Sequence, residues 1–245
     1  LSSSVVPITT YLDTIQVQNL LQSALGYAEE LAVSLYGCYQ KAVTIYNLPS
    51  AFMVSLTACI VPAVSAALTK KDKVGAGKIA ESALRVGAML ALPAGIGLTV
   101  LAGPIIQLLY PETNQEVGTQ CLMVLGIASI FVCIMLLCNA ILQANGRTAL
   151  PIWFIAIGSA IKLGVNFVLV QMPSVGIKGA PVGTLVCFGI VSVLELAAIK
   201  RVTPHPPKYL RVFGKAAVAA VLMGAAAWAS YGLLSGHFGN TLSVA

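Results

Sequence analysis

Ionisable side chains within long apolar runs are the residues of this 245-residue sequence that could do chemistry. Lys162 lies near the middle of the apolar run 151–171, and Asn166 follows it by one helical turn on the same face. A charge at that depth in hydrocarbon is costly and indicates a functional site by default. Because Lys162 is too deep to reach the interface easily, we expect it to face a cavity and bind a ligand there, or to form an ion pair.

Three other ionisable residues lie within or at the ends of apolar runs. Asp13, in the run 1–18, is a candidate site for a coupling cation, and the alternative is an inward-facing carboxylate at a helix end near the outer interface. Lys41 is a candidate ligand contact, and the alternative is a lysine that extends to the outer interface. Glu195 lies close to the cytoplasmic end of its run, which favours an interfacial ion pair with a basic residue such as Lys200.

Polar aromatic residues surround Lys41 in the sequence. They are Tyr36, Tyr39 and Tyr46, and Asn47 follows the last of them.

Proline removes a helical hydrogen-bond donor and clashes with the preceding turn, so Pro49 predicts a kink or hinge inside the long apolar run 38–67.

The sequence has too few aspartate and histidine residues, and no suitably spaced cysteines, to form a known catalytic or metal-binding arrangement. The aspartates are Asp13 and Asp72, and the two histidines, His205 and His237, fall in loops that we expect on opposite sides of the membrane. The six cysteines lie in or beside apolar runs without a C-x-x-C pair, which is typical of small hydrophobic residues. We therefore predict no catalytic residue, no metal and no cofactor, and the sequence does not favour an enzyme.

The elements that position these residues are predicted to be membrane spans. Hydrophobic residues make up 58% of the chain and charged residues 9%, and the mean hydropathy is +0.91, so a water-soluble fold is excluded. Several apolar runs have close to the roughly 20 residues that a tilted helix needs to cross the bilayer. The predicted fold class is an all-α polytopic membrane protein with about seven transmembrane helices. These are expected at 1–18, 38–67, 86–109, 121–143, 151–171, 180–199 and 215–235.

Charge in the connecting loops predicts the orientation of these helices. The loops 68–85 and 200–215 hold most of the basic residues, whereas 110–120 holds Glu112 and Glu116 and no basic residue. Since lysine and arginine remain on the cytoplasmic side of short loops, 68–85 and 200–215 are expected in the cytoplasm and 110–120 outside. This pattern accounts for the net charge of +6 without a nucleic-acid partner.

Five blocks in sequence resemble motifs of the multidrug/oligosaccharidyl-lipid/polysaccharide (MOP) exporter superfamily. The blocks are YNLP, IVPAVSAALTKKD, ALPAGIGLTVLAGPIIQLLYP, AILQANGRTALP, and IKLGVNFVLV with VGIKGAPVGTL. The most similar branch is the polysaccharide biosynthesis, stage V sporulation protein B-like group.

The resemblance implies a fold of two six-helix lobes around a central cavity that works by alternating access. This chain would be the C-terminal half, with residues 1–199 forming the second lobe and 200–245 a basic cytoplasmic loop and one additional transmembrane helix. The chain begins at Leu1 without a Met, so we expect a piece of a longer membrane protein, in which an N-terminal lobe of about six helices precedes this chain and the first helix here is shortened.

The resemblance also implies a function, a flippase for a lipid-linked oligosaccharide or cell-envelope polysaccharide precursor in the bacterial cytoplasmic membrane. Lys41 and Lys162 would attract the pyrophosphate, with Asn166 and Asn47 as further polar contacts, and tyrosines such as Tyr39 would pack on sugar faces. The expected partners are the lipid-linked saccharide, membrane lipids and the N-terminal lobe, with H⁺ or Na⁺ as a possible coupling cation.

Two other functions remain open at this point. One is a cation-coupled multidrug exporter in which Asp13 binds Na⁺ or H⁺, and the other is a membrane scaffold for envelope-polymer synthesis that transports nothing. The charge of the cavity separates them, because a basic cavity favours pyrophosphate, an acidic cavity favours cationic drugs, and a dry apolar interface favours a scaffold.

Overall fold

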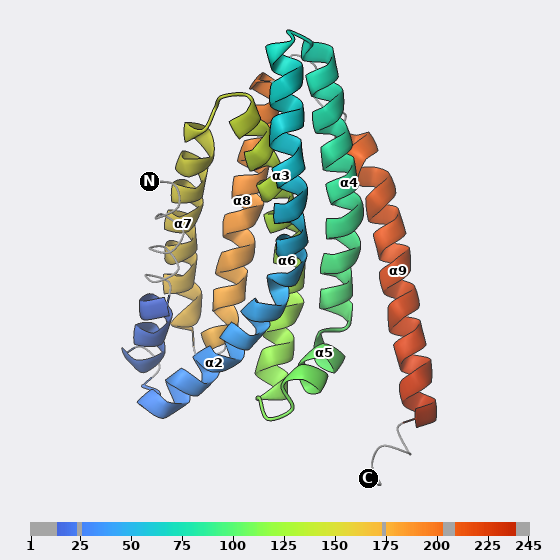
Figure 1. Ribbon diagram of the computed structural model, residues 1–245. Coiled ribbons are helices and arrows are strands. Elements are labelled where there is room, and N and C mark those ends of the chain that lie inside the picture. The colour runs from blue at the N-terminus through green and yellow to red at the C-terminus, as the bar shows by residue number, and fades with distance from the viewer. Residues whose placement is uncertain (1–13, 24–25, 173–174, 203–208, 239–245) are drawn as a thin grey trace.

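The described residues of the computed structural model, 14–23, 26–172, 175–202 and 209–238, form a bundle of long helices without a strand (Figure 1). A helical segment at 14–23 comes first. The elements that follow are α2 (Glu29–Tyr46), α3 (Leu48–Thr69), α4 (Lys73–Val100), α5 (Ala102–Leu109), α6 (Gln115–Ala144), α7 (Ala149–Val170), the short 3₁₀ helix η1 (Gly176–Lys178), α8 (Gly179–Val202) and α9 (Tyr209–Phe238).

Six helical segments within this part of the chain are long and apolar enough to cross a membrane. This confirms the predicted fold class, an all-α polytopic membrane protein. The seventh expected span, 1–18, lies mostly outside the described residues. The division of the chain at residue 199 stays a prediction.

The kink expected at Pro49 separates two helices. α2 ends at Tyr46, and α3 begins at Leu48 with Pro49 in its first turn, where the missing N–H costs nothing. Figure 1 shows the result, because α2 runs obliquely across the bundle and α3 then rises steeply from its end.

The boundaries of the spans around residues 68–109 differ from the prediction. The stretch 68–85, expected as a loop, is mostly helix, because α4 begins at Lys73. The carboxylate of Asp72 caps this helix by accepting a hydrogen bond of 2.7 Å from the backbone N–H of Gly75. The expected span 86–109 is divided at Leu101, where α4 ends and α5 begins. A hydropathy profile detects only the apolar part of a helix, so it missed the polar turns at the start of α4.

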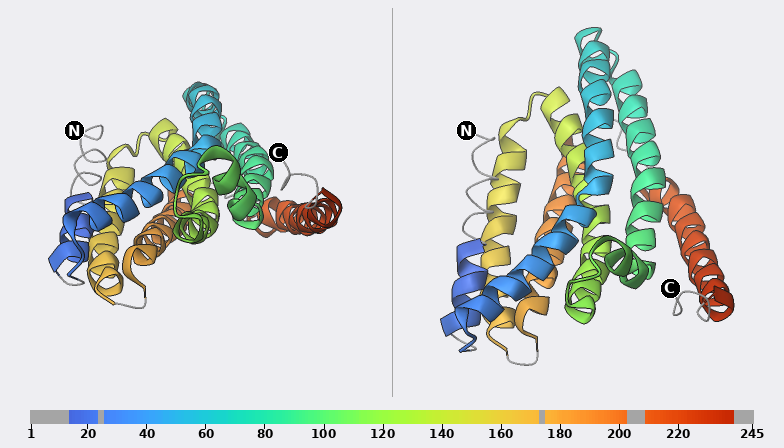
Figure 2. Two further views of the ribbon diagram at one scale, coloured as in Figure 1. Left: turned by 90° about the horizontal axis from the view of Figure 1, so that it is seen from below. Right: turned by 60° about the horizontal axis from the view of Figure 1, so that its bottom comes forward.

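α6 is the central helix of the bundle. It contacts α2, α3, α4, α5 and α8, and it carries more buried residues than any other described helix. α7 packs against α8, and α9 packs against α4 at one edge (Figure 2). Glycine allows the α7–α8 contact, because a Cβ atom at Gly158 would lie 2.4 Å from Val191 Cγ2.

The two ends of the bundle differ in charge. The α3–α4 connection, the α6–α7 connection and the end of α8 share one end of the bundle, and the connection from α5 to α6 lies at the other (Figure 1). The first end carries basic residues of 70–85 and 200–201, and the second carries acidic residues of 112–116. The helix arrangement therefore agrees with the loop alternation from which we predicted the orientation.

Candidate functional site

A cavity of about 460 Å³ lies in the bundle and is lined by residues of five helices. Its walls come from α2, the start of α3, the middle of α6, α7 and α8. The polar residues that line it are Tyr36, Tyr39, Gln40, Tyr46, Asn47, Ser50, Ser159, Lys162 and Thr184. The other walls are apolar, which is the usual composition of a ligand cavity with a few placed polar groups.

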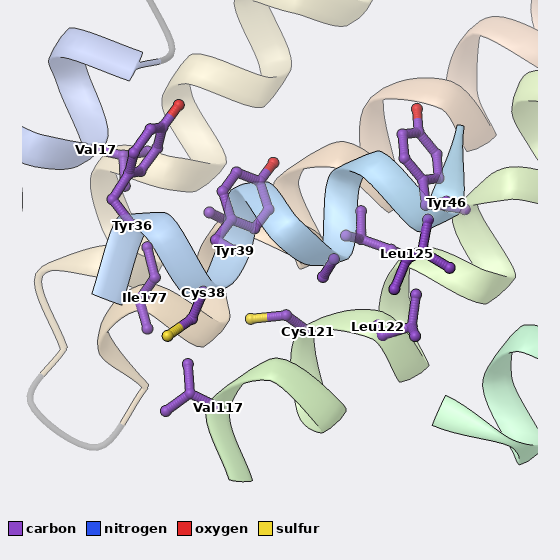
Figure 3. Close-up of a cluster of buried hydrophobic side chains, with 14 of the residues drawn as sticks. Val17, Tyr36, Cys38, Tyr39, Tyr46, Val117, Cys121, Leu122, Leu125 and Ile177 are labelled. Carbon is purple, nitrogen blue, oxygen red and sulfur yellow. The ribbon is translucent and has the colours of Figure 1, made fainter. Parts of the chain in front are cut away.

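One face of α2 supplies most of the polar wall. Its cavity residues recur every three or four positions, at Tyr36, Tyr39, Gln40, Val43 and Tyr46, as one helical face requires. Figure 3 shows the three tyrosine rings on the same side of α2 with their hydroxyl groups pointing the same way. The opposite side of α2 carries apolar and thiol groups that pack onto α6. α2 thus presents a polar face to the cavity and an apolar face to α6.

Hydrogen bonds fix the hydroxyl groups of Tyr36 and Tyr39 in this wall. The hydroxyl of Tyr36 lies 2.8 Å from Thr14 Oγ1 and also accepts a hydrogen bond from Gln40 Nε2. The hydroxyl of Tyr39 lies 3.3 Å from Thr184 Oγ1 on α8. These bonds hold the rings in place, so the wall is built before any ligand binds.

Lys162 is the residue with a full charge among the described residues that line the cavity. It projects from α7, and Ser159 lies one turn earlier on the same face. Next to it, the backbone carbonyl of Leu163 accepts a hydrogen bond of 2.8 Å from Gln16 Nε2, which attaches the helical segment at 14–23 to α7. The cavity is therefore basic and polar on one side, and aromatic on the other.

Asn166 is adjacent to the cavity and does not line it. Its side chain is fully buried where α7 meets α8. A Cβ atom at Gly183 would lie 2.0 Å from Asn166 Oδ1 and 3.5 Å from Lys162 Cγ. The amide thus fills the space that the glycine leaves, and it supports the helix that presents Lys162.

The structure separates Lys41 from the cavity residues. Its Nζ donates a hydrogen bond of 2.6 Å to Thr113 Oγ1, and it lies 5.4 Å from the centre of the Tyr110 ring. These partners belong to the connection between α5 and α6, on another side of α2. Asp13 lies outside the described residues, so its role as a cation site stays a prediction.

The structure therefore brings together four of the residues that the sequence predicted as ligand contacts, Tyr39, Tyr46, Asn47 and Lys162. It also adds residues that sequence reasoning missed. Gln40 and Ser159 each lie one turn from a predicted residue, so helical spacing could have found them. Thr184 gives no comparable signal, because only the packing of α8 brings it to Tyr39.

Comparison with known protein families identifies one that covers nearly the whole chain. The model of the family described as lipid II flippase MurJ matches residues 2–244.

Individual relatives agree with this match. The chain is 31% identical over 201 residues to an uncharacterized membrane protein, YabM, of Bacillus subtilis, covering 82% of this chain and 36% of the relative. It is 27% identical to stage V sporulation protein B of the same organism, covering 73% and 34%. It is 28% identical to a probable lipid II flippase MurJ of Rickettsia prowazekii, covering 73% and 35%. The chain thus spans about a third of the length of these relatives.

A solved structure has a similar fold. It is the inward-facing conformation of a multidrug resistance MATE family transporter of the MOP superfamily, with a TM-score of 0.58 and 17% sequence identity. The match covers 87% of this chain and 51% of the transporter. At this identity the similarity shows the fold alone. The match to the lipid II flippase MurJ family and the similarity to stage V sporulation protein B confirm the predicted relation to this group of exporters.

Proposed function

Because this chain belongs to the MurJ lipid II flippase family, we propose that it forms one lobe of a flippase for a lipid-linked saccharide precursor of the cell envelope. The lobe works with a second, N-terminal lobe by alternating access, and the lipid tail stays in the bilayer while the polar head crosses. One observation carries the proposal, namely a cavity inside a membrane-spanning bundle that combines one lysine with three tyrosines.

The chemistry of the cavity fits the head group of such a lipid. The ammonium group of Lys162 suits a pyrophosphate, because a charge-assisted hydrogen bond is stronger than a neutral one. Tyrosine rings offer flat apolar faces to a sugar, and their hydroxyl groups bond to its polar edge. Ser159 and Thr184 add short polar groups on the other two walls.

The two alternative functions agree less well with this cavity. A carrier of cationic drugs needs acidic groups, and the described residues that line the cavity include none. A scaffold without transport needs no polar cavity between its helices. The carboxylate of Asp13 stays a candidate for H⁺ or Na⁺ binding, as a coupling site beside the saccharide function.

A reconstituted transport assay tests the proposal. The full-length protein is placed in liposomes with a fluorescent lipid-linked saccharide, and flipping is followed by the loss of fluorescence on adding an impermeant quencher. We expect flipping by the wild-type protein and by Lys78→Met, a control at an exposed lysine of α4. Lys162→Met should lose most of the activity.

Complementation provides the second readout. The full-length gene should restore growth of a bacterial strain that lacks its own envelope-lipid flippases, and the 245-residue chain alone should not. Transport of cationic dyes without transport of the lipid-linked saccharide would contradict the proposal.

A further inference from the structure

Glu195 is a carboxylic acid buried in the apolar interior of the bundle, away from the cavity. Its side chain is 0% exposed, and it lies on α8 within a segment that can span the membrane. Neither carboxyl oxygen has a hydrogen-bond partner among the described residues. The ion pair that we expected with Lys200 or a neighbouring basic residue does not form, because Glu195 faces inward while Lys200 is exposed.

Among the described residues, the elements packed against α8 offer Glu195 no basic group at its level. α8 packs against α6, α7 and η1. On α6, the thiol of Cys138 is the titratable group that interacts with Glu195. On α7, Lys162 lies at the level of Gly183, which is twelve residues or about 18 Å along α8 from Glu195.

In the described part of η1 and α8, the remaining charged groups lie at the ends of α8. On η1, Lys178 is at the outer end and pairs with Glu116 of α6 at 3.3 Å. On α8 itself, Lys200 and Arg201 are exposed at the cytoplasmic end. On the next turn of α8, Ile199 belongs to a buried apolar cluster with residues of α3, α4, α6 and α9.

An ionised carboxylate without a partner in such surroundings costs several kcal/mol, about as much as a domain can spare. A neutral carboxyl costs far less, so the packing in this structure requires Glu195 to hold a proton. Glu195 is also near water, because the end of α8 at Val202 is seven residues away, about 10 Å along the helix. A small separation of the cytoplasmic halves of α6 and α8 would hydrate it.

We propose that Glu195 is a proton-binding site of the transport cycle, neutral while α6 and α8 are packed as here and ionised when their cytoplasmic halves separate. The proton leaves to, and returns from, cytoplasmic water, and no other group is consumed. Linkage then requires that a rise in pH favours the separated state and that proton binding favours the packed state. The role in transport rests on the proposed function, whereas the link between the proton and helix packing does not.

Cys138 provides a built-in reporter, because it is fully buried beside Glu195. In the full-length protein, every cysteine except Cys138 is replaced, and the rate of its modification by a thiol reagent is measured over a range of pH. The same series is run with Glu195→Gln, which keeps the size of the side chain and cannot ionise. Dividing the two rates at each pH removes the intrinsic pH dependence of the thiol.

The rate of Cys138 modification in the protein with Glu195 is divided by the rate in Glu195→Gln. We expect this ratio to rise with pH, by up to about tenfold per pH unit for one linked proton. A negative charge beside Cys138 would by itself slow modification, so a rise reports opening of the contact. Glu81→Gln, a control at a partly exposed glutamate paired with Arg85, should leave the rates unchanged. If Glu195→Gln does not accumulate, Glu195→Leu replaces it, because an apolar chain at a buried acid is commonly tolerated.

A ratio that stays constant with pH would overturn the proposal, since opening would then be independent of the proton. Flipping of the lipid-linked saccharide is measured in the same preparations, and Glu195→Gln should lose the pH dependence of the wild-type rate. A rising ratio with an unaltered pH profile of flipping overturns the role in transport. If the wild-type protein flips no saccharide, the proposed function fails, and the labelling ratio still decides whether Glu195 links a proton to helix packing.

Discussion

Lys162 and Glu195 are ionisable residues on two neighbouring helices of one bundle, but their surroundings differ. Lys162 faces a cavity whose walls carry hydroxyl and amide groups. Glu195 is fully buried, its neighbour Ile199 on the next turn belongs to an apolar cluster, and it has no hydrogen-bond partner among the described residues. Lys162 can keep its charge in the polar cavity, whereas Glu195 must bind a proton to be neutral in its buried position. The role of a charged residue in a membrane span therefore depends on the chemistry of the facing helices more than on its depth.

The largest expected effect is that of Lys162→Met on transport. A charge-assisted hydrogen bond contributes about 1.5–3 kcal/mol, so losing it should reduce flipping by at least about tenfold. Methionine is apolar and similar in length, so expression should hold. Lys162→Arg should keep partial activity, because it retains the charge with another geometry. Flipping rates and melting temperatures of the detergent-solubilised protein are measured together.

A structural role for Lys162 would give another pattern. If its charge balances a buried carboxylate such as Asp13, Lys162→Met leaves an unpaired charge and lowers stability by about 3–5 kcal/mol. A strongly reduced melting temperature would then accompany the loss of flipping. Full activity of Lys162→Met would eliminate the ligand role.

A second prediction concerns the glycine that lets α7 and α8 approach beside Lys162. In Gly183→Ala the new Cβ would lie 2.0 Å from Asn166 Oδ1, so a helix or the buried amide must move. We expect a loss of stability of about 1–3 kcal/mol and weaker flipping. Gly189→Ala on the same helix is the matched control, because nothing lies within 4 Å of its Cβ position, and it should stabilise the helix by about 0.5–1 kcal/mol. Equal melting temperatures for the two variants would show that α7 and α8 pack less closely than described.

A smaller effect is expected for Tyr39→Phe in the aromatic wall. The hydroxyl of Tyr39 lies 3.3 Å from Thr184 Oγ1. Tyr39→Phe removes this hydroxyl group and its hydrogen bond from the cavity wall and leaves the aromatic ring in place. A neutral hydrogen bond contributes about 0.5–1.5 kcal/mol, which corresponds to a change of about two- to tenfold in the substrate concentration for half-maximal flipping. Tyr27→Phe, at a tyrosine outside the cavity, should leave that concentration unchanged. The same shift in both variants would contradict a role of the Tyr39 hydroxyl in the wall.

Much of the fold could be predicted from the sequence, because hydropathy, loop charge and proline position act locally. The break at Pro49 is an example. Span boundaries were less predictable, as at Lys73, where a capped polar turn extends α4 beyond its apolar part.

The candidate site was predictable only in part, because it depends on which helix faces which. A cavity residue one turn from a predicted one, such as Ser159, follows from helical spacing. Lys41 was predicted as a ligand contact together with Lys162, but the structure directs it to Thr113. Glu195 resembled an interfacial residue because Lys200 is near in sequence, but 3.6 residues per turn place the two on different faces.

The smallest expected effect on transport is that of Lys41→Met, which tests whether the cavity ends where the structure places its wall. Lys41 bonds Thr113 at 2.6 Å and contacts the Tyr110 ring, both outside the cavity. Flipping should stay within about twofold of wild type, while stability falls by about 1.5–3 kcal/mol through the lost charge-assisted hydrogen bond. Thr113→Val removes the same bond from the other side, so the double variant should be no less stable than the weaker single variant. A loss of flipping comparable to that of Lys162→Met, with the melting temperature unchanged, would instead place Lys41 on the path of the pyrophosphate, as the sequence first suggested.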